Sequence, residues 1–208
     1  MVEAKAELRS RLRAARSARV EQWHSEANQD AAAESVADAV REDEIVAELL
    51  GAPGAVAATY RSRRGEPPTD VLNHRLGEAG VGLLFPVCVD DERLGWVPFH
   101  EGVVRWVPDA RGMLRPDGKL VGVGAEGLIA AGTSVVFVPA LAVARDGMRL
   151  GQGGGYYDRV LTALPGAAET AGVPRPLSVA IIYASELLES VPADPWDVRV
   201  DRWITVPD

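Results

Sequence analysis

The 208-residue sequence has only one cysteine, Cys88, and its three histidines, His24, His74 and His100, lie far apart. A single cysteine cannot form an internal disulfide, and scattered histidines do not make the clustered ligand pattern of a zinc site. These shortages exclude a small disulfide-rich scaffold and a zinc module. We therefore expect a reducing compartment, the cytoplasm.

Long apolar runs are also absent. The longest, near residues 135–144, is too short to cross a bilayer, which takes about 20 residues. The first ten residues are charged and contain no hydrophobic signal core. We expect no membrane anchor.

Positive charge is scarce, because 22 Lys and Arg face 30 Asp and Glu, for a formal net charge of −8. A negative protein is repelled by the phosphate backbone, so we expect no nucleic-acid partner. The chain also lacks the Gly-x-x-x-x-Gly-Lys-Ser/Thr motif, which excludes an ordinary P-loop ATPase.

Helical and strand patterns alternate along the chain. Leu8, Leu12 and Ala15 recur at helical spacing, and further helices are expected at 21–40, 44–50, 69–78 (capped by Thr69) and 156–164. Strands are expected at 56–60, 81–86, 94–99, 134–139, 177–183 and 200–206, whereas 103–117 is too rich in Pro and Gly to assign. The pattern predicts a single α/β domain over residues 1–208, with a mostly parallel central sheet flanked by helices.

The first helix concentrates basic residues. Between residues 1 and 19, Glu3 and Glu7 face six cations: Lys5, Arg9, Arg11, Arg13, Arg16 and Arg19. Lys5 and Arg9 are four residues apart and share a face of the helix, separate from the face that packs. Taken alone, such a face is most simply a solvated one.

Two glycine patterns are candidate nucleotide loops. Gly122-x-Gly124-x-x-Gly127 has the spacing of a dinucleotide fingerprint, but the strand before it is too short and the helix after it would end near Gly132. We interpret it as a surface loop.

The second pattern, Arg149 to Arg159, follows the buried strand that ends at Pro139 and contains four glycines in five residues. Glycines allow close approach of the backbone, and the helix after the loop directs its free N–H groups and positive dipole end at an anion. Arg149 adds a bidentate charge for phosphate. Asp158 either caps this helix or holds Mg²⁺ beside the phosphates, and a flexible loop with a capping Asp is the plain alternative.

Residues 138–158 read Val-Pro-Ala-Leu-Ala-Val-Ala-Arg-Asp-Gly-Met-Arg-Leu-Gly-Gln-Gly-Gly-Gly-Tyr-Tyr-Asp. This segment resembles the signature V-P-G-L-A-F-D-x-x-G-x-R-L-G-x-G-x-G-Y-Y-D of the 5-formyltetrahydrofolate cyclo-ligases, also called methenyltetrahydrofolate synthetases. Other family landmarks follow in order across nearly the whole chain: Lys5-x-x-x-Arg9, Glu66-x-x-Thr69, Phe85-Pro86 and Pro192-x-x-x-x-Asp197-x-x-Val200-Asp201.

The resemblance implies that ATP and Mg²⁺ drive closure of 5-formyltetrahydrofolate to 5,10-methenyltetrahydrofolate, with release of ADP and phosphate. It implies ATP contacts from Lys5, Arg9, Arg149, Leu150, Gly151, Gln152, Gly153, Gly154, Gly155, Tyr156 and Tyr157. It further implies folate contacts from Glu66 and Tyr156, and Mg²⁺ ligation by Asp158 and Asp197. We assign no catalytic residue, and we expect a monomer whose partners are ATP and a reduced folate.

The chemistry suits these residue types. An N-formyl oxygen is a poor leaving group until ATP phosphorylates it, after which N10 can attack the carbon. Phosphoryl transfer of this kind requires positioning and charge neutralisation more than a protein nucleophile. Two other interpretations stay open: a relative that keeps the Mg-ATP site but acts on another substrate, and a non-catalytic nucleotide or folate binder.

The sequence also departs from the family pattern. Ala144 stands where the signature has Asp, with Asp146 two residues later. In the segment that corresponds to the family's Trp-x-Ile-x-Glu/Gln-Pro, residues 111–116, Arg111 replaces the Trp and Arg115 replaces the polar or acidic residue. Tyr60, Trp96 and Trp106 either stack on a pterin or belong to the core and rim.

Overall fold

The computed structural model describes residues 2–22, 26–99, 105–108 and 114–208. Its centre is a seven-stranded sheet in the order β12–β10–β7–β1–β2–β3–β6. Five neighbouring strands are parallel: β12 (Arg202–Val206), β10 (Leu177–Tyr183), β7 (Thr133–Pro139), β1 (Val56–Ala58) and β2 (Gly82–Cys88). The edge strands β3 (Leu94–Phe99) and β6 (Gly122–Val123) run antiparallel. The predicted α/β class with a mostly parallel sheet is confirmed.

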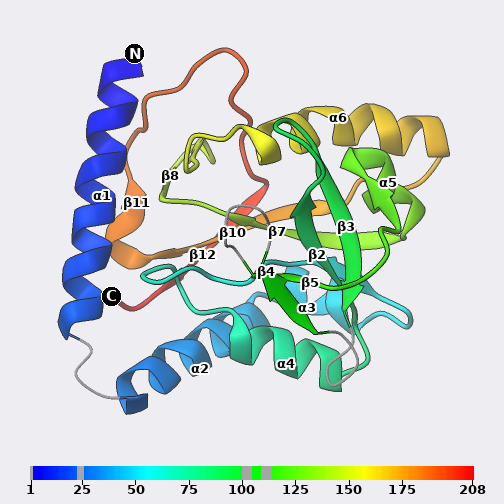
Figure 1. The fold of residues 1–208 in the computed structure, drawn as a ribbon, viewed down its shortest axis with the longest axis horizontal. Helices are drawn as coiled ribbons and strands as arrows, with labels where there is room; N and C mark the ends of the chain where they lie inside the picture. Colours follow the sequence, from blue (N-terminus) through cyan, green and yellow to red (C-terminus); the bar gives the residue numbers. More distant parts are fainter. Residues whose placement is uncertain (1, 23–25, 100–104, 109–113) are drawn as a thin grey trace.

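Helices cover both faces of this sheet (Figure 1). On one face lie α2 (Glu26–Glu42), α3 (Glu44–Gly51) and α4 (Asp70–Glu78), and on the other lie α5 (Gly124–Ala130) and α6 (Tyr156–Ala171). In β7, Val135 and Phe137 pack toward the first layer, whereas Val136 and Val138 pack toward the second. Since side chains alternate between the faces, a strand buried on both must be apolar throughout.

The first helix, α1 (Val2–Gln22), lies outside these layers, at the left of Figure 1. Leu8 and Leu12 pack on a small sheet made of β8 (Ala142–Ala144), β9 (Arg149–Leu150) and β11 (Leu187–Leu188). A 3₁₀ turn, η1 (Ala184–Glu186), precedes β11, and β4 (Trp106–Pro108) pairs with β5 (Leu114–Pro116) within the stretch left unassigned from sequence.

The predicted packing face of α1 is partly wrong. Ala15 is exposed, whereas Lys5 and Arg16 are buried on the same side as Leu8 and Leu12. Both cations are paired with carboxylates there, and paired charges can be buried. Hydrophobic periodicity does not count such positions, which is why the pattern assigned Lys5 to a separate face.

Two helix boundaries also differ from the expectation. α1 continues to Gln22, so the helix expected from residue 21 begins only at Glu26, with residues 23–25 outside the described part. α6 passes through Pro165 and ends at Ala171, where Gly172 takes a left-handed conformation. Leu164 and Ala168 keep the apolar face of α6 buried beyond the proline, and this burial outweighs the lost hydrogen bond.

The interpretation of the Gly122–Gly127 segment as a plain surface loop is wrong. The segment forms the turn from β6 into α5. A Cβ at Gly122 would lie 2.4 Å from the Cα of Gly127, so these glycines let strand and helix backbones touch. No residue of this segment lines the large pocket described below.

No helix among the described residues is both long and apolar enough to cross a bilayer.

Candidate active site

A cavity of about 750 Å³ lies beyond the carboxyl ends of β1, β2 and β7. The chain leaves β1 toward β2 on one side and later returns to form β7 on the other, so β1 marks a reversal of strand order. Such a switch point opens a crevice in α/β sheets, where ligands commonly bind. Loops after β1 and β7, the N-terminal turns of α1 and α6, and residues 194–197 form its walls.

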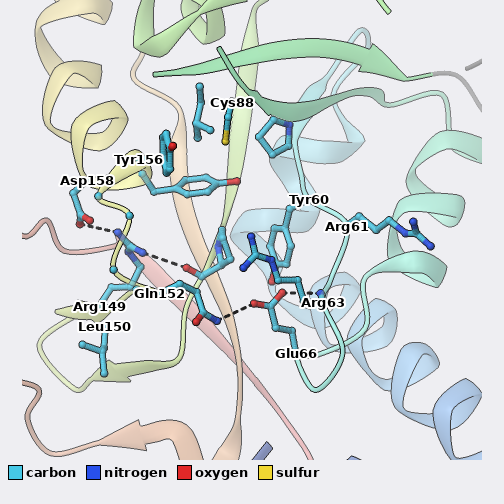
Figure 2. Close-up of a pocket in the computed structure, with 18 of the residues that line it drawn as sticks. Tyr60, Arg61, Arg63, Glu66, Cys88, Arg149, Leu150, Gln152, Tyr156 and Asp158 are labelled. Atoms are coloured by element: carbon cyan, nitrogen blue, oxygen red, sulfur yellow. Dashed lines mark hydrogen bonds and ion pairs between the residues drawn. The ribbon is translucent and has the colours of Figure 1, made fainter. Parts of the chain in front are cut away.

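Every residue singled out from the sequence as a ligand contact lines this cavity. Lys5 and Arg9 belong to α1, Glu66 to the loop after β1, and Asp197 to residues 194–197, which we call the late loop. The remaining residues form the unbroken run 149–158. Figure 2 shows Glu66 facing Gln152 across the cavity, with Arg149 and Asp158 beside them. Folding thus brings together residues almost 200 positions apart.

The cavity wall is positively charged on a protein whose formal net charge is −8. Six basic side chains outnumber four acidic ones: Lys5, Arg9, Arg61, Arg63, Arg115 and Arg149 against Glu66, Asp158, Asp194 and Asp197. A concave surface with an excess of one charge sign concentrates ligands of the opposite sign. The pocket is therefore suited to an anion.

Lys5 is only 5% exposed and is held by two carboxylates of the late loop. Its ammonium donates to Asp194 at 2.5 Å and also to Asp197. Burial alone would lower the pKa of Lys5, but the hydrogen bonds and charges of the two acids raise it. Lys5 stays charged and connects α1 to the late loop. Asp194 was not predicted from sequence, although it lies three residues before Asp197.

The Gly-rich loop, residues 151–155, is attached to α1 by two arginines. Arg9 Nε donates to the Gly151 carbonyl at 2.9 Å, and Arg13 Nη2 donates to the Gln152 carbonyl at 2.9 Å. Gly153 and Gly155 have φ values of +109° and +68°, which L side chains rarely adopt. Arg13, which the sequence did not single out, therefore belongs to the loop's support.

Asp158 does not cap α6, so one of its two predicted roles is excluded. The N-cap position is Gly155, and no side chain caps this end. Instead, Asp158 Oδ1 accepts a hydrogen bond from Arg149 Nη2 at 2.6 Å, while Arg149 Nη1 donates to the Pro139 carbonyl at 3.2 Å (Figure 2). The free N–H groups of the first turn of α6 remain available at the Gly-rich loop.

Two buried polar atoms on the cavity residues lack a partner among the described residues: Arg149 Nε and the Tyr157 hydroxyl. Buried polar atoms are nearly always hydrogen-bonded, so such exceptions need an explanation. A bound ligand or water at the wall would satisfy them. Burial also raises the pKa of Tyr157, so its hydroxyl stays protonated and able to donate.

Glu66 is held in place by its own loop. Its Oε2 accepts from the Arg63 N–H at 2.9 Å, and its Oε1 accepts from Gln152 Nε2 at 3.2 Å. Thr69 makes no side-chain cap on α4, contrary to expectation. Its hydroxyl donates instead to the Tyr60 carbonyl at 2.7 Å and accepts from the Ser62 N–H, so it fixes the loop that carries Glu66.

Of the three aromatic candidates, Trp96 is fully buried in the core and donates to the Gly124 carbonyl, so it is no stacking residue. Tyr60 and Trp106 line the cavity, and Trp106 also packs edge-on against Phe85 with ring centroids 5.1 Å apart. Trp196, 68% exposed, lines the cavity too and was missed. Its position between Asp194 and Asp197, inside the Pro192–Asp201 motif, was the available signal.

A sequence model of the 5-formyltetrahydrofolate cyclo-ligase family matches residues 1–206. The chain belongs to that family. A 5-formyltetrahydrofolate cyclo-ligase of Mycolicibacterium smegmatis is 35% identical over 181 residues, which cover 82% of this chain and 86% of the relative. The mitochondrial 5-formyltetrahydrofolate cyclo-ligase of Arabidopsis thaliana is 44% identical over 70 residues, covering 33% of this chain and 25% of the relative.

Solved structures show the same fold. The 5,10-methenyltetrahydrofolate synthetase of Aquifex aeolicus superposes with a TM-score of 0.69 at 25% identity, covering 97% of this chain and 89% of that one. The Mycoplasma pneumoniae 5,10-methenyltetrahydrofolate synthetase gives 0.62 at 20% identity, covering 96% and 97%. The chain is thus an enzyme of the cyclo-ligase family.

The departures from the cyclo-ligase signature have different places in the fold. Ala144 is buried against α1 in the cluster of Leu8 and Leu12, away from the cavity lining. Asp146 is in the turn between β8 and β9, where it pairs with Arg199 at 2.8 Å, so it does not supply the missing acid to the pocket. Arg115 does line the cavity, and residues 111–113 lie outside the described part.

The cavity offers Mg²⁺ oxygen donors but no complete cage. Asp158 and Asp197 both line it, each beside a cation, and no group of three or more His, Cys, Asp or Glu in the described ranges could hold a metal ion. Mg²⁺ seldom uses an all-protein cage and is usually held by one or two carboxylates together with substrate phosphates. The two acids fit that pattern.

Proposed function

We propose that this cyclo-ligase-family enzyme converts 5-formyltetrahydrofolate to 5,10-methenyltetrahydrofolate, with ATP bound as its Mg²⁺ complex and hydrolysed overall to ADP and phosphate. The observation that carries the proposal is a single cavity lined by cations of α1, the Gly-rich loop, two acids and Glu66. The family membership and the activity after which the relatives are named support it.

ATP phosphates would lie on the Gly-rich loop. Residues 151–155, the first turn of α6 and Arg149 supply N–H donors and a guanidinium, and Arg9 and Lys5 approach from α1. Mg²⁺, held by Asp158 and Asp197, would neutralise charge on the phosphates.

The reduced folate would occupy the side of the cavity that carries Glu66. A pterin ring presents N–H donors, and the Glu66 carboxylate is an acceptor that is hydrogen-bonded by the Arg63 N–H and by Gln152. Tyr156, Tyr60 and Trp106 line the same cavity and offer aromatic faces for the ring.

In the reaction, the formyl oxygen attacks the terminal phosphorus of ATP, and ADP leaves. N10 then attacks the activated carbon and loses its proton, and the C–O bond breaks with release of phosphate. The carbon ends bonded to N5 and N10, and the original formyl oxygen ends in phosphate. The side chains of the cavity position the reactants and neutralise charge, which is the main requirement of phosphoryl transfer.

The test mixes the protein with Mg-ATP and 5-formyltetrahydrofolate and follows the absorbance of the methenyl product together with ADP. We expect one ADP for each methenyl group formed. ADP release stimulated only by another folate or small amide would favour a relative with a different substrate. A ligand-induced rise in melting temperature without any ADP would show a non-catalytic binder. We also expect a monomer to be active.

A further inference from the structure

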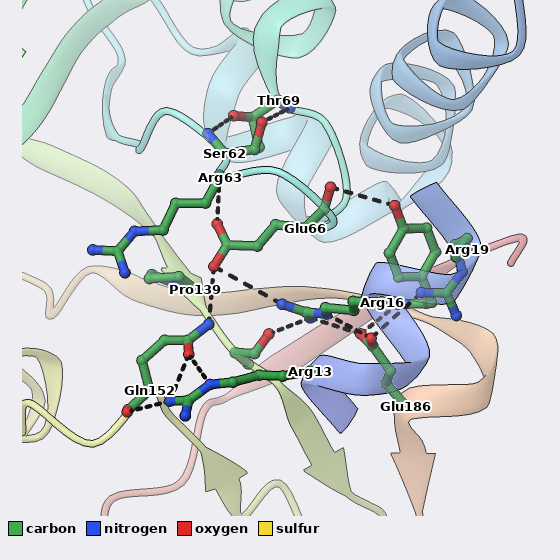
Figure 3. A network of polar contacts seen from close by, with 12 residues as sticks. Arg13, Arg16, Arg19, Ser62, Arg63, Glu66, Thr69, Pro139, Gln152 and Glu186 are labelled. Carbon is green, nitrogen blue, oxygen red and sulfur yellow. Dashed lines mark hydrogen bonds and ion pairs between the residues drawn. The ribbon is translucent and has the colours of Figure 1, made fainter. Parts of the chain in front are cut away.

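Gln152 forms a bridge between the two halves of the cavity (Figure 3). It belongs to the Gly-rich loop, and its side-chain Oε1 accepts from Arg13 Nε and Nη2 at 3.2 and 3.1 Å. At its other end, Nε2 donates to Glu66 Oε1 at 3.2 Å. One amide side chain therefore connects α1, the proposed phosphate loop and the proposed folate acid.

The direction of this amide follows from its neighbours. A guanidinium can only donate, so the atom facing Arg13 must be the amide oxygen. An ionised carboxylate can only accept, so the atom facing Glu66 must be the NH₂ group. A rotation of the amide by half a turn would lose the bonds at both ends. Gln152 thus has a single arrangement that satisfies both partners.

Arg16 of α1 is a second side chain, besides Gln152, that lies close to Glu66. Arg16, buried behind Glu66, donates to both oxygens of Glu186 at 2.7 and 2.8 Å and to the Ala140 carbonyl at 2.7 Å. Its remaining Nη1 lies 3.9 Å from Glu66 Oε1, beyond hydrogen-bond distance. Arg16 therefore gives Glu66 charge compensation without a direct hydrogen bond, whereas Gln152 gives it a bond from the opposite loop.

We propose that Gln152 is a positioning residue that makes nucleotide and folate binding cooperative. Phosphates on residues 151–155 would order the loop that carries Gln152, and the ordered amide would hold Glu66 in the orientation that accepts the pterin N–H groups. The inference rests on the proposed function. The signature quoted above fixes no residue type at the position of Gln152.

The test is a set of calorimetric titrations with a matched pair of variants. 5-Formyltetrahydrofolate is titrated into the protein alone and into protein saturated with Mg²⁺ and a non-hydrolysable ATP analogue. We expect the analogue to increase folate affinity at least about fivefold in the wild type, and folate to increase analogue affinity by the same factor. In Gln152→Leu, which loses both ends of the bridge, the factor should fall close to one.

Gln152→Glu separates the two ends, since it keeps an acceptor for Arg13 but has no donor for Glu66. We expect it to lose the coupling as Gln152→Leu does, whereas Arg11→Ala, an exposed change on α1, should keep it. A change that merely loosens the fold weakens the affinity for both ligands but leaves unchanged the factor by which each ligand increases the affinity for the other. Melting temperatures check that the variants fold.

Four results would overturn the inference. Coupling that persists in Gln152→Leu would show that the bridge carries none of it. Coupling lost in Gln152→Leu but kept in Gln152→Glu would assign Gln152 only to anchoring the loop on Arg13. Independent binding of the two ligands by the wild type would remove the inference but leave the proposed function standing, whereas no binding of either ligand would overturn both.

Discussion

At the scale of single residues, the Gly-rich loop shows two different reasons for glycine. Gly153 and Gly155 have positive φ, whereas Gly154 does not. A Cβ at Gly154 would lie 2.9 Å from the Tyr156 ring. The side chain of a neighbour, and not the backbone, restricts this position.

Gly154→Val should therefore displace Tyr156 and lower ATP affinity by roughly tenfold or more, the equivalent of about 1.4 kcal/mol. The fold should persist, because the loop is at the surface of the cavity. Calorimetry with ATP measures the effect. Gly166→Val is the matched control, since a Cβ there meets nothing within 4 Å. Equal ATP affinity in the two variants would refute the role of the loop.

Lys5 and Arg9 are expected to differ when replaced by Ala. Both changes should weaken ATP binding by about 1–3 kcal/mol, the cost of a lost charge-assisted contact. Lys5→Ala should also lower the melting temperature, because it leaves Asp194 and Asp197 without their shared cation. Arg9 is only half-buried, so Arg9→Ala should change the melting temperature less.

The control for this pair is Arg11→Ala, since Arg11 is exposed on α1 and makes no ion pair with the described residues. Arg13 is unsuitable because it binds Gln152. If Lys5→Ala has the melting temperature of the wild type and binds ATP normally, Lys5 neither stabilises the fold nor contacts ATP.

At the scale of secondary-structure elements, strands buried on both faces were predictable and short strands were not. β7 and β10 contain continuous apolar runs, which are typical of buried strands. β8, β9 and β11 have two or three residues each, and their pairing depends on contacts with α1 that no local pattern encodes. The buried face of α1 was misjudged for the same reason, since Lys5 and Arg16 are buried only because of distant acids.

The two acids of the terminal family motif, Asp197 and Asp201, have different roles in the structure. Asp197 lines the cavity, whereas Asp201 joins β10 to β12. Asp201 accepts from the Ser178 N–H and hydroxyl at 2.8 and 2.6 Å and from both terminal nitrogens of Arg175. Burial alone would raise its pKa, but these hydrogen bonds lower it below 3.8.

Asp201→Asn should lower the free energy of unfolding by about 1–3 kcal/mol at pH 7, because it removes charged hydrogen bonds. A lowered pKa means that this stabilisation is present above the ordinary value of 3.8 and is lost as the pH falls through the folded value. Urea unfolding at pH 7 and at pH 3 measures the change. A difference between variant and wild type that is equal at both pH values would contradict the account.

At the scale of the whole molecule, the cavity is an assembly of segments from both ends of the chain. Motif residues such as Arg149 and Glu66 could be chosen from the sequence, because their residue types and spacing resemble a known signature. The contacts between cavity residues and their partners could not be predicted. Lys5 pairs with Asp194 and Arg13 with Gln152, and each pair joins residues more than 130 positions apart. Such contacts arise from tertiary packing alone.

Asp158 and Asp197 test whether this assembly holds the metal. Asp158→Asn and Asp197→Asn should each raise the Mg²⁺ concentration for half-maximal ADP binding by roughly tenfold or more, since a contact to a charged group contributes about 1.5–3 kcal/mol. Mg²⁺ titration of the protein–ADP mixture by calorimetry measures it. Asp146→Asn is the control, because Asp146 also pairs with an arginine but lies outside the cavity lining. An unchanged Mg²⁺ requirement in both cavity variants would exclude the metal assignment.

The most direct test of the central claim follows the formyl oxygen itself. 5-Formyltetrahydrofolate labelled with oxygen-18 in the formyl group is converted by the wild-type protein with Mg-ATP, and the products are analysed by mass spectrometry. If ATP phosphorylates that oxygen in the cavity between α1 and the Gly-rich loop, the label must appear in inorganic phosphate in step with the methenyl product. Methenyl product formed with unlabelled phosphate, or without ATP, would contradict the account.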